Sequence, residues 1–431
     1  MSNGARFFKS GAAAFVGLSL AATMAGCSGS TGADPTAGGD GGDTVTLEFA
    51  QWWDPELPDG AFEALITQFE DENPGIEVEL LSGPYASTKE QLFAGAAAGT
   101  MSDVVGLDGA WVSEFANQGA ISDLTALMAD YGYDDSQLAS QIQVNGATYM
   151  IPVVNFVYPL YTNDAILAEA GVDAPPSNRS EFKDTAQAIV DNTDASGWAL
   201  NLSLETPSGI QNSVMSWVWA SGGSMLNDGQ PDLTNDDVTS MVEYIQELYD
   251  AGLVAPGAFT MKEQDMVEEF TNGRVGLMVD SLAHVTQIRE SNPDLEFSIS
   301  AIPAVDGYEG ERGIPYASWG IGVSANTEHP EESWKLVEFL MSAEVNGELS
   351  TVANAFPGNT EATPDFEGKD ELFSQAFEIY QAGYPANEFT GLPVAEELMR
   401  QFGEGLQTTL DSEGDPAAML EDVNSTWESE F

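Results

Sequence analysis

Tryptophan and aspartate residues gather where predicted strands end. Trp52, Trp53 and Asp54 follow the first predicted strand, Thr44–Ala50, and Asp108 follows the third, Asp103–Leu107. In open α/β sheets, ligands bind beyond the carboxyl ends of the strands. An indole presents a flat apolar face, and a carboxylate accepts hydrogen bonds from hydroxyl groups. These four residues are therefore candidates for binding a ligand that carries both C–H faces and hydroxyls.

Each of these residues also has a structural interpretation. Two adjacent tryptophans can pack in a core or a lid, and Asp54 can cap a helix. Asp108 can form a turn, whereas Trp111, on the helix that follows, is better suited to a core. The sequence leaves both interpretations open at these positions.

A long apolar and aromatic stretch, Ile151–Asn163, follows a hairpin turn signal at Asn145-Gly146. Two prolines keep the stretch out of a helix and favour an extended conformation. Asn155 and Tyr158 are polar tips in this otherwise apolar run, which makes them candidate ligand-binding residues. The pattern suits a segment that leaves one lobe, lines a cleft and enters a second lobe, although a buried edge strand is the alternative.

A helix rich in aromatic residues precedes the glycine pair Gly222-Gly223. Trp217 and Trp219 are two positions apart, so they point to different faces of this helix and at most one of them stacks on a ligand. Trp219 lies nearer the glycine loop. Trp219 and Gly223 are therefore the candidates from this segment.

Three further candidates follow later in the chain. Asp280 ends a predicted strand, and Tyr316 and Trp319 lie in the predicted extended segment Pro315–Ser324. Trp319 precedes Gly320, where the backbone can come close to a ligand while the ring stays exposed. The rival interpretation places Trp319 in the core.

Metal and catalytic chemistry is restricted by the few cysteine and histidine residues. With one cysteine and two histidines, the chain cannot form an intramolecular disulfide or a zinc site of several histidines. His284 is interpreted as a core or cleft-wall residue, and His329 as a surface residue. Neither a nucleophile-elbow motif nor a phosphate-binding loop occurs. The chain is therefore predicted to be no enzyme and to use no cofactor.

Length and charge exclude several classes of function. The 431 residues exceed one ordinary core, so two domains are expected, and 43% hydrophobic residues suffice to fill both. The formal net charge of −58 repels phosphate groups, which argues against nucleic acid as a partner. We interpret this charge mainly as a solvated surface, with an acidic interaction surface as the alternative.

The N-terminal segment has the pattern of a secretory signal. Arg6 and Lys9 precede the short apolar run Ala12–Ala22, and the following Met24–Cys27 resembles a bacterial lipobox. Residues 1–26 are thus predicted to be a signal peptide and Cys27 to be lipidated. Residues 27–43, which are poor in apolar side chains, are predicted to be a flexible tether.

Several motifs in order resemble the bacterial extracellular solute-binding proteins of the sugar-binding type, which serve ABC importers. FEALITQFEDENPGIEVEL reads as strand–helix–strand, and DVVGLDGAWVSEFANQGAISDLT follows it. The resemblance implies an α/β, two-lobe periplasmic-binding-protein-like fold with three interlobe crossings, near Ile151–Tyr158, Gly276–Asp280 and Tyr316–Val323. The predicted lobes are residues 44–153 plus 280–320, and residues 154–279 plus 321–431.

The resemblance also implies a function. The chain is expected to bind a neutral oligosaccharide between the lobes and to deliver it to an ABC permease, as a monomer anchored by lipid to the extracellular face of the cytoplasmic membrane. Family members often bring to the cleft a loop that corresponds to Phe356–Asn359, which adds Phe356 and Asn359 as candidates. The alternatives are a receptor for a non-sugar solute, a secreted glycoside-active enzyme and an adhesion lipoprotein.

Overall fold

The computed structural model describes residues 44–431, except for the side chain of Ala86. The predicted signal peptide, Cys27 and the tether lie outside the described residues. The described residues form two main β-sheets and a short β-ribbon. The eight-stranded first sheet consists of β1 (Val45–Gln51), β2 (Ile76–Ser82), β3 (Val104–Leu107), β4 (Ile142–Val144), β5 (Ala147–Val157), β12 (Gly313–Val323), β13 (Phe356–Pro357) and β14 (Tyr384–Ala386).

The first strand–helix–strand unit confirms the sequence interpretation. β1 pairs in parallel with β2 and also with β3. Between β1 and β2, helix α1 (Ala61–Glu72) buries Phe62, Leu65, Ile66 and Phe69, the residues that recur at helical spacing. The parallel pairing directs the carboxyl ends of β1 and β3 to the same edge of the sheet.

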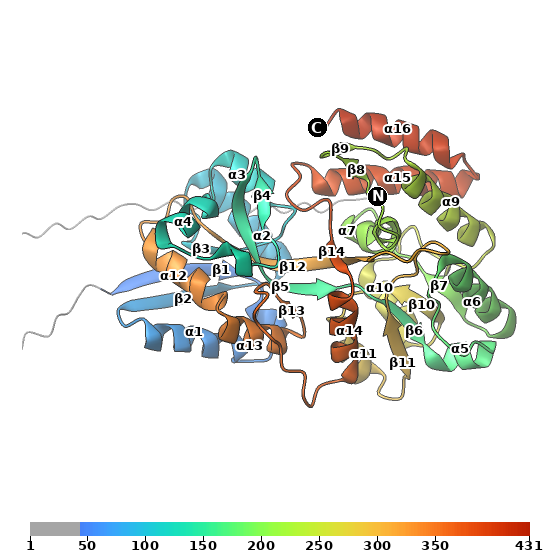
Figure 1. Ribbon diagram of the computed structural model, residues 1–431, viewed down its shortest axis with the longest axis horizontal. Coiled ribbons are helices and arrows are strands. Elements are labelled where there is room, and N and C mark those ends of the chain that lie inside the picture. Colours follow the sequence, from blue (N-terminus) through green and yellow to red (C-terminus); the bar gives the residue numbers. More distant parts are fainter. Residues whose placement is uncertain (1–43) are drawn as a thin grey trace, which may run out of the picture. The chain divides into compact units, whose positions relative to one another are not determined.

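The two long strands β5 and β12 are antiparallel neighbours and run side by side in the middle of Figure 1. Tyr316 pairs with Val157, and Trp319 pairs with Val154, next to a shift of register at Gly320. Beyond Val157 the chain continues through Pro159 into β6 (Leu160–Asn163), which belongs to the second sheet. The predicted passage of Ile151–Asn163 from one sheet to the other is therefore seen.

The second sheet has four strands in the order β11 (Phe297–Ser300), β6, β10 (Val275–Val279) and β7 (Ser196–Ala199). β10 and β11 both pair with β6. The chain thus stays beside the second sheet on both sides of Asp280, and the crossing predicted at Gly276–Asp280 is wrong. It returns to the first sheet between β11 and β12.

The structure also distributes the later segments differently from the predicted lobes. β11, in the segment predicted for the first lobe, belongs to the second sheet. Helices α12 (Pro330–Leu340) and α13 (Ala343–Ala353), predicted for the second lobe, pack into the core of the first sheet. The sequence does not show which sheet these helices pack on, because their apolar faces fit against either sheet.

Helices from distant parts of the chain pack around the two sheets. Around the first sheet lie α2 (Tyr85–Ala98), α3 (Val112–Gln118) and α4 (Leu124–Tyr131). The other helices and the ribbon are α5 (Asp164–Ala170), α6 (Arg179–Asn192), α7 (Ser208–Ile210), α8 (Ser216–Trp219), β8 (Leu226–Asn227) with β9 (Gln230–Pro231), α9 (Asp236–Asp250), α10 (Glu263–Thr271), α11 (His284–Ser291), α14 (Glu371–Gln381), α15 (Ala395–Ser412) and α16 (Pro416–Glu428). None of the helices in residues 44–431 has the length and apolar content that a membrane span requires.

Candidate ligand-binding cavity

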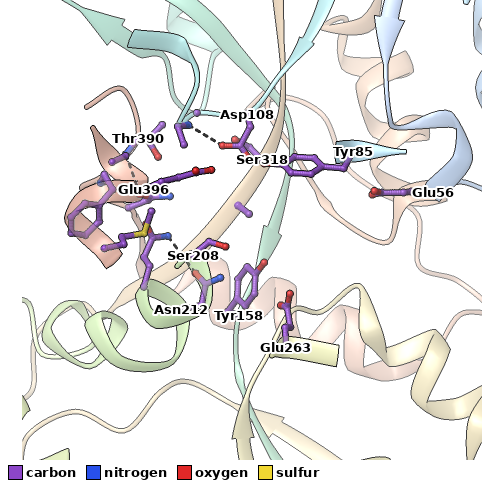
Figure 2. A pocket seen from close by; sticks show the side chains of 18 residues that line it. Glu56, Tyr85, Asp108, Tyr158, Ser208, Asn212, Glu263, Ser318, Thr390 and Glu396 are labelled. Atoms are coloured by element: carbon purple, nitrogen blue, oxygen red, sulfur yellow. Dashed lines mark hydrogen bonds between the residues drawn. The ribbon is translucent and has the colours of Figure 1, made fainter. Parts of the chain in front are cut away.

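A cavity of about 350 Å³ is lined by residues from the first sheet and its helices and by residues from the segments that pack with the second sheet. Tyr85 begins α2, and Asp108 follows β3, both beside the first sheet. Tyr158 lies in the passage from β5 to β6, and Asn212 lies on the segment between α7 and α8. Figure 2 shows these side chains facing a common space. Such a volume falls within the range of pockets for small ligands.

Asp108 forms the turn that its sequence allowed and also lines the cavity. Its Oδ1 accepts a hydrogen bond of 2.8 Å from the backbone N–H of Ala110, which stabilises the turn after β3. Its Oδ2 accepts a bond of 3.2 Å from the Tyr85 hydroxyl. Partial burial raises the pKa of Asp108, while the bonds from Ala110 and Tyr85 lower it. The carboxylate is thus fixed in place while it lines the cavity.

Tyr85 is the aromatic ring that reasoning from the sequence missed. Its side chain is 37% exposed, and it packs on Trp111, with 5.0 Å between the ring centroids, and on Trp52, with 5.2 Å. The two tryptophans therefore support an exposed ring instead of being exposed themselves. The signal was present in the sequence, because Gly83-Pro84 can begin a helix whose first residue is Tyr85.

The cavity wall opposite Tyr85 and Asp108 is polar. Ser208, Gln211 and Asn212 line the cavity where the helical segment α7–α8 passes through a π-helical turn at Gln211–Met215. Such turns are rare and occur frequently at functional sites. Ser318 on β12 adds a hydroxyl.

Four carboxyl side chains line the cavity: Glu56, Asp108, Glu263 and Glu396. Of the described residues in this lining, none is lysine, arginine or histidine. Lys89, which does not line the cavity, forms an ion pair with Glu396, with 3.0 Å between Nζ and Oε1. The cavity can therefore accept hydrogen bonds at several points, and its charge favours neutral or cationic ligands over anionic ones.

The structure brings only two of the predicted site residues to this cavity, namely Asp108 and Tyr158. Burial raises the pKa of the Tyr158 hydroxyl, as do the nearby carboxylates of Glu263 and Asp280, so this hydroxyl remains a neutral donor and acceptor. Asp54, the neighbour of Glu56, lies in a 3₁₀ turn at Asp54–Glu56 and is half-buried.

The predicted tryptophans are buried. Trp53 is 0% and Trp319 is 6% exposed, and the two rings stack with 5.7 Å between centroids and 6° between planes. Trp219 is also buried, and its indole N–H donates to Glu388 at 2.6 Å. The structure therefore buries these rings, as the rival interpretation had it for Trp53 and Trp319, and the exposed position predicted for Trp219 is wrong.

The remaining predicted residues hold neighbouring segments together. Asn155 donates to the Pro357 carbonyl at 3.5 Å, and Asn359 donates to the Met341 carbonyl at 2.7 Å. Phe356 is fully buried, and Tyr316 is nearly so. A Cβ atom at Gly223 would lie 2.7 Å from that of Asp237, so this glycine permits close packing. Asp280 is fully buried next to His284.

The family model of the bacterial extracellular solute-binding protein matches residues 53–347. The chain belongs to this family. The resemblance carried by the sequence motifs is thereby confirmed. The family consists of binding proteins, and the cavity of this solute-binding protein includes Asp108, which directly follows β3.

Two relatives and one solved structure extend this finding. A Brucella abortus (strain 2308) protein, named as a binding protein, is 26% identical over 371 residues, which cover 84% of this chain and 87% of the relative. The multiple sugar-binding protein of Streptococcus mutans is 23% identical over 316 residues, covering 70% and 72%. The crystal structure of the cyclic α-maltosyl-1,6-maltose binding protein from Arthrobacter globiformis matches with a TM-score of 0.77 at 19% identity, over 90% and 99% of the two chains. The predicted two-lobe α/β fold is confirmed.

Proposed function

We propose that this solute-binding protein binds an oligosaccharide in the cavity between its two lobes and delivers it to the permease of an ABC importer. The observation that carries the proposal is the pairing of an exposed ring, Tyr85, with a fixed carboxylate, Asp108, in one cavity wall. A pyranose ring offers a C–H face to the first and hydroxyls to the second. The name of the Streptococcus mutans relative supports a sugar ligand.

The polar residues of the opposite wall complete a saccharide site. Gln211 and Asn212 each offer an amide that donates and accepts, and Ser208 and Ser318 offer hydroxyls. A ligand held between walls from different lobes gains contacts only when both walls reach it. Binding therefore stabilises a closed arrangement of the lobes.

A calorimetric screen tests the proposal. We expect at least one neutral di- to tetrasaccharide to bind with one site per chain. The screen includes an amino acid and spermidine, and absence of heat from every saccharide would refute the sugar assignment.

A cationic solute is the second candidate, because four carboxyl groups and no basic side chain line the described cavity. If spermidine binds and no saccharide gives heat in the calorimetric screen, the cationic solute is favoured. If an amino sugar binds more tightly than its neutral parent sugar, the ligand is still a saccharide, but a positively charged one.

Binding is proposed to occur without turnover. The saccharide that binds in the screen is incubated with the chain, and the products are separated by chromatography. We expect the saccharide to be recovered intact. Cleavage at a rate that scales with protein concentration would make the chain an enzyme.

Attachment to the extracellular face of the membrane is proposed to depend on Cys27, from the Met24–Cys27 motif and the tether that follows. Cys27→Ser should release the protein from the membrane fraction and leave ligand affinity unchanged. A wild-type protein that carries no acyl mass would contradict the lipid anchor.

A further inference from the structure

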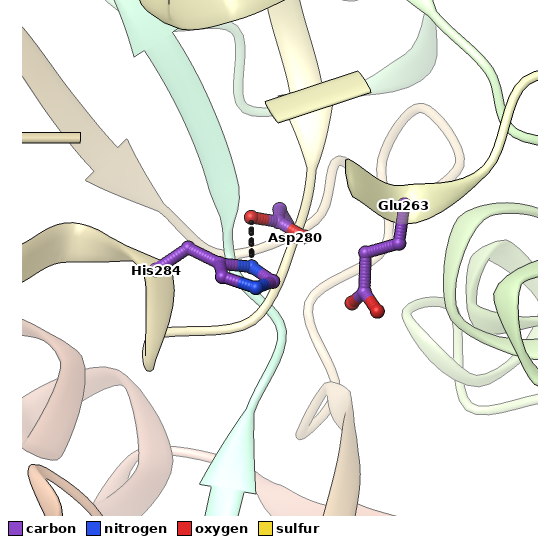
Figure 3. A group of neighbouring side chains, drawn as sticks. All are labelled: Glu263, Asp280 and His284. Carbon is purple, nitrogen blue, oxygen red and sulfur yellow. Dashed lines mark hydrogen bonds and ion pairs between the residues drawn. The ribbon is translucent and has the colours of Figure 1, made fainter. Parts of the chain in front are cut away.

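Three side chains that could hold a metal ion converge beside the cavity. Glu263 begins α10, Asp280 directly follows β10, and His284 begins α11. One potential ligand atom from each of these residues lies within 4.8 Å of the other two. Figure 3 shows Asp280 between the other two side chains. Three separate elements thus bring together one imidazole and two carboxylates.

Asp280 has an unsatisfied hydrogen-bonding atom in the middle of this group. The residue is 0% exposed, and its Oδ2 lies 2.8 Å from Nδ1 of His284. Its Oδ1 has no hydrogen-bond partner among the residues that the structure describes. In Figure 3, this second oxygen lies on the side of Glu263. A buried carboxylate oxygen without a partner is costly, and a cation is one group that satisfies it.

The local charges also favour a cation. Glu263 faces Asp280, so two carboxyl groups converge on one point. The imidazole of His284 is the third group, and its Nδ1 lies 2.8 Å from Oδ2 of Asp280. Two carboxyl groups and one imidazole from different elements therefore meet at this point.

We propose that Glu263, Asp280 and His284 bind a divalent transition-metal ion of the zinc class. Imidazole nitrogen and carboxylate oxygen are both ordinary zinc ligands, whereas Mg²⁺ and Ca²⁺ prefer oxygen ligands alone. Metal–ligand distances of about 2.0–2.2 Å require the three ligand atoms to draw together, which small rotations of Glu263 and His284 at the ends of their helices can supply.

The position of the site links it to the cavity. Glu263 is one of the cavity-lining residues, and possible ligand atoms of Asp280 and His284 lie within 4.8 Å of its carboxylate. A zinc ion with three protein ligands keeps a fourth position open for water or another oxygen ligand. The ion would add positive charge to a wall that otherwise carries acidic groups.

Zinc titration of the metal-free chain tests this site. The chain carries Cys27→Ser, which removes its single thiol, has no affinity tag, and is treated with a chelator and dialysed before calorimetry. We expect one equivalent of Zn²⁺ to bind and to raise the melting temperature, and Mg²⁺ to bind at least tenfold more weakly. A chain that binds no Zn²⁺, or binds Mg²⁺ equally well, overturns the proposal.

Variants locate the site. Glu263→Gln and His284→Gln should each weaken Zn²⁺ binding at least about tenfold, since even partners of metal ligands cost 10–100-fold when mutated. His329→Gln is the matched control, because it removes the other histidine of the chain and should leave binding unchanged. Asp280→Asn tests the buried carboxylate; if it does not fold, Glu263→Gln at the cavity wall decides.

Two results would overturn the location of the site. Unchanged Zn²⁺ affinity in both Glu263→Gln and His284→Gln is one, and loss of binding in His329→Gln is the other. The proposal does not rest on the identity of the solute. Saccharide titrations of the metal-free and zinc-loaded chain report separately on the proposed transport function, which stands if the metal-free chain binds the saccharide.

Discussion

At the scale of single residues, the side chains that line the cavity differ from those that support them from behind. Tyr85 is exposed in the cavity wall, and Trp52 and Trp111 pack against its ring. Asp108 is held by Ala110 and by the Tyr85 hydroxyl. Because the support comes from the protein, little side-chain freedom remains to be lost when a ligand binds.

Asp108→Asn tests the carboxylate. Asparagine keeps the oxygen that accepts from Ala110, so stability should change little, but it removes the charge that strengthens a hydrogen bond to a sugar hydroxyl. Hydrogen bonds to charged groups contribute about 1.5–3 kcal/mol, so the dissociation constant should rise roughly tenfold to a hundredfold in calorimetry. Asp54→Asn is the control, since Asp54 does not line the cavity. Equal effects of both substitutions would contradict the assignment.

Tyr85 and Trp319 should respond in opposite ways. Tyr85→Ala removes a partly exposed stacking ring worth about 0.5–1.5 kcal/mol, so affinity should fall roughly threefold to tenfold with a small change in melting temperature. Trp319→Ala empties a buried site and should cost about 3–5 kcal/mol of stability. The melting temperature and the dissociation constant are measured for both variants. A stable Trp319→Ala chain with weakened binding would return the stacking role to Trp319.

At the scale of elements, local patterns predicted much of the fold. The first strand–helix–strand unit follows from alternation in β1 and helical spacing in α1. The passage of β5 towards β6 follows from its prolines and continuous apolar character. Helix α2 begins at Tyr85, directly after Gly83-Pro84, and no candidate residue was predicted in this first turn.

Other features depend on contacts between distant segments, and the sequence carries no local signal for them. The stacking of Trp53 on Trp319 results from the position of β12 within the first sheet. The pairing of β11 with β6 overturned both a predicted crossing and a lobe boundary. A tryptophan near a strand end is compatible with core or cavity until its neighbours from other segments are known.

Gly358 tests one such contact between segments. A Cβ at this position would lie 1.9 Å from the Pro152 carbonyl oxygen, where β13 reaches β5. Gly358→Ala should therefore cost about 1–3 kcal/mol or more of unfolding free energy, since overpacking of a tight site costs this much. Gly83→Ala is the control, because its added methyl meets only the Thr88 hydroxyl at 3.4 Å. Denaturant unfolding with equal midpoints for both variants would contradict this packing.

At the scale of the whole molecule, charge and lobe arrangement dominate. A formal net charge of −58 produces self-repulsion in the compact state. Salt shortens the range of this repulsion, from about 10 Å at 0.1 M to about 3 Å at 1 M. The same charge keeps anionic solutes away from the cavity.

The melting temperature should therefore rise between low salt and 1 M KCl. NaCl at equal ionic strength should give the same rise if screening is the cause, and both are compared by calorimetry. A melting temperature that falls or stays constant would show that self-repulsion does not limit the stability of this chain.

The central claim, an oligosaccharide held between the lobes, is tested most directly by a crystal structure of the chain with a saccharide that binds in the calorimetric screen. We expect the sugar in the cavity, with a hydroxyl within about 2.5–3.0 Å of the Asp108 carboxylate and a pyranose face against Tyr85. Tyr158 and Asn212 should reach the same sugar from the other wall. A saccharide bound elsewhere on the chain, with Asp108 and Tyr85 both out of contact, would contradict the account.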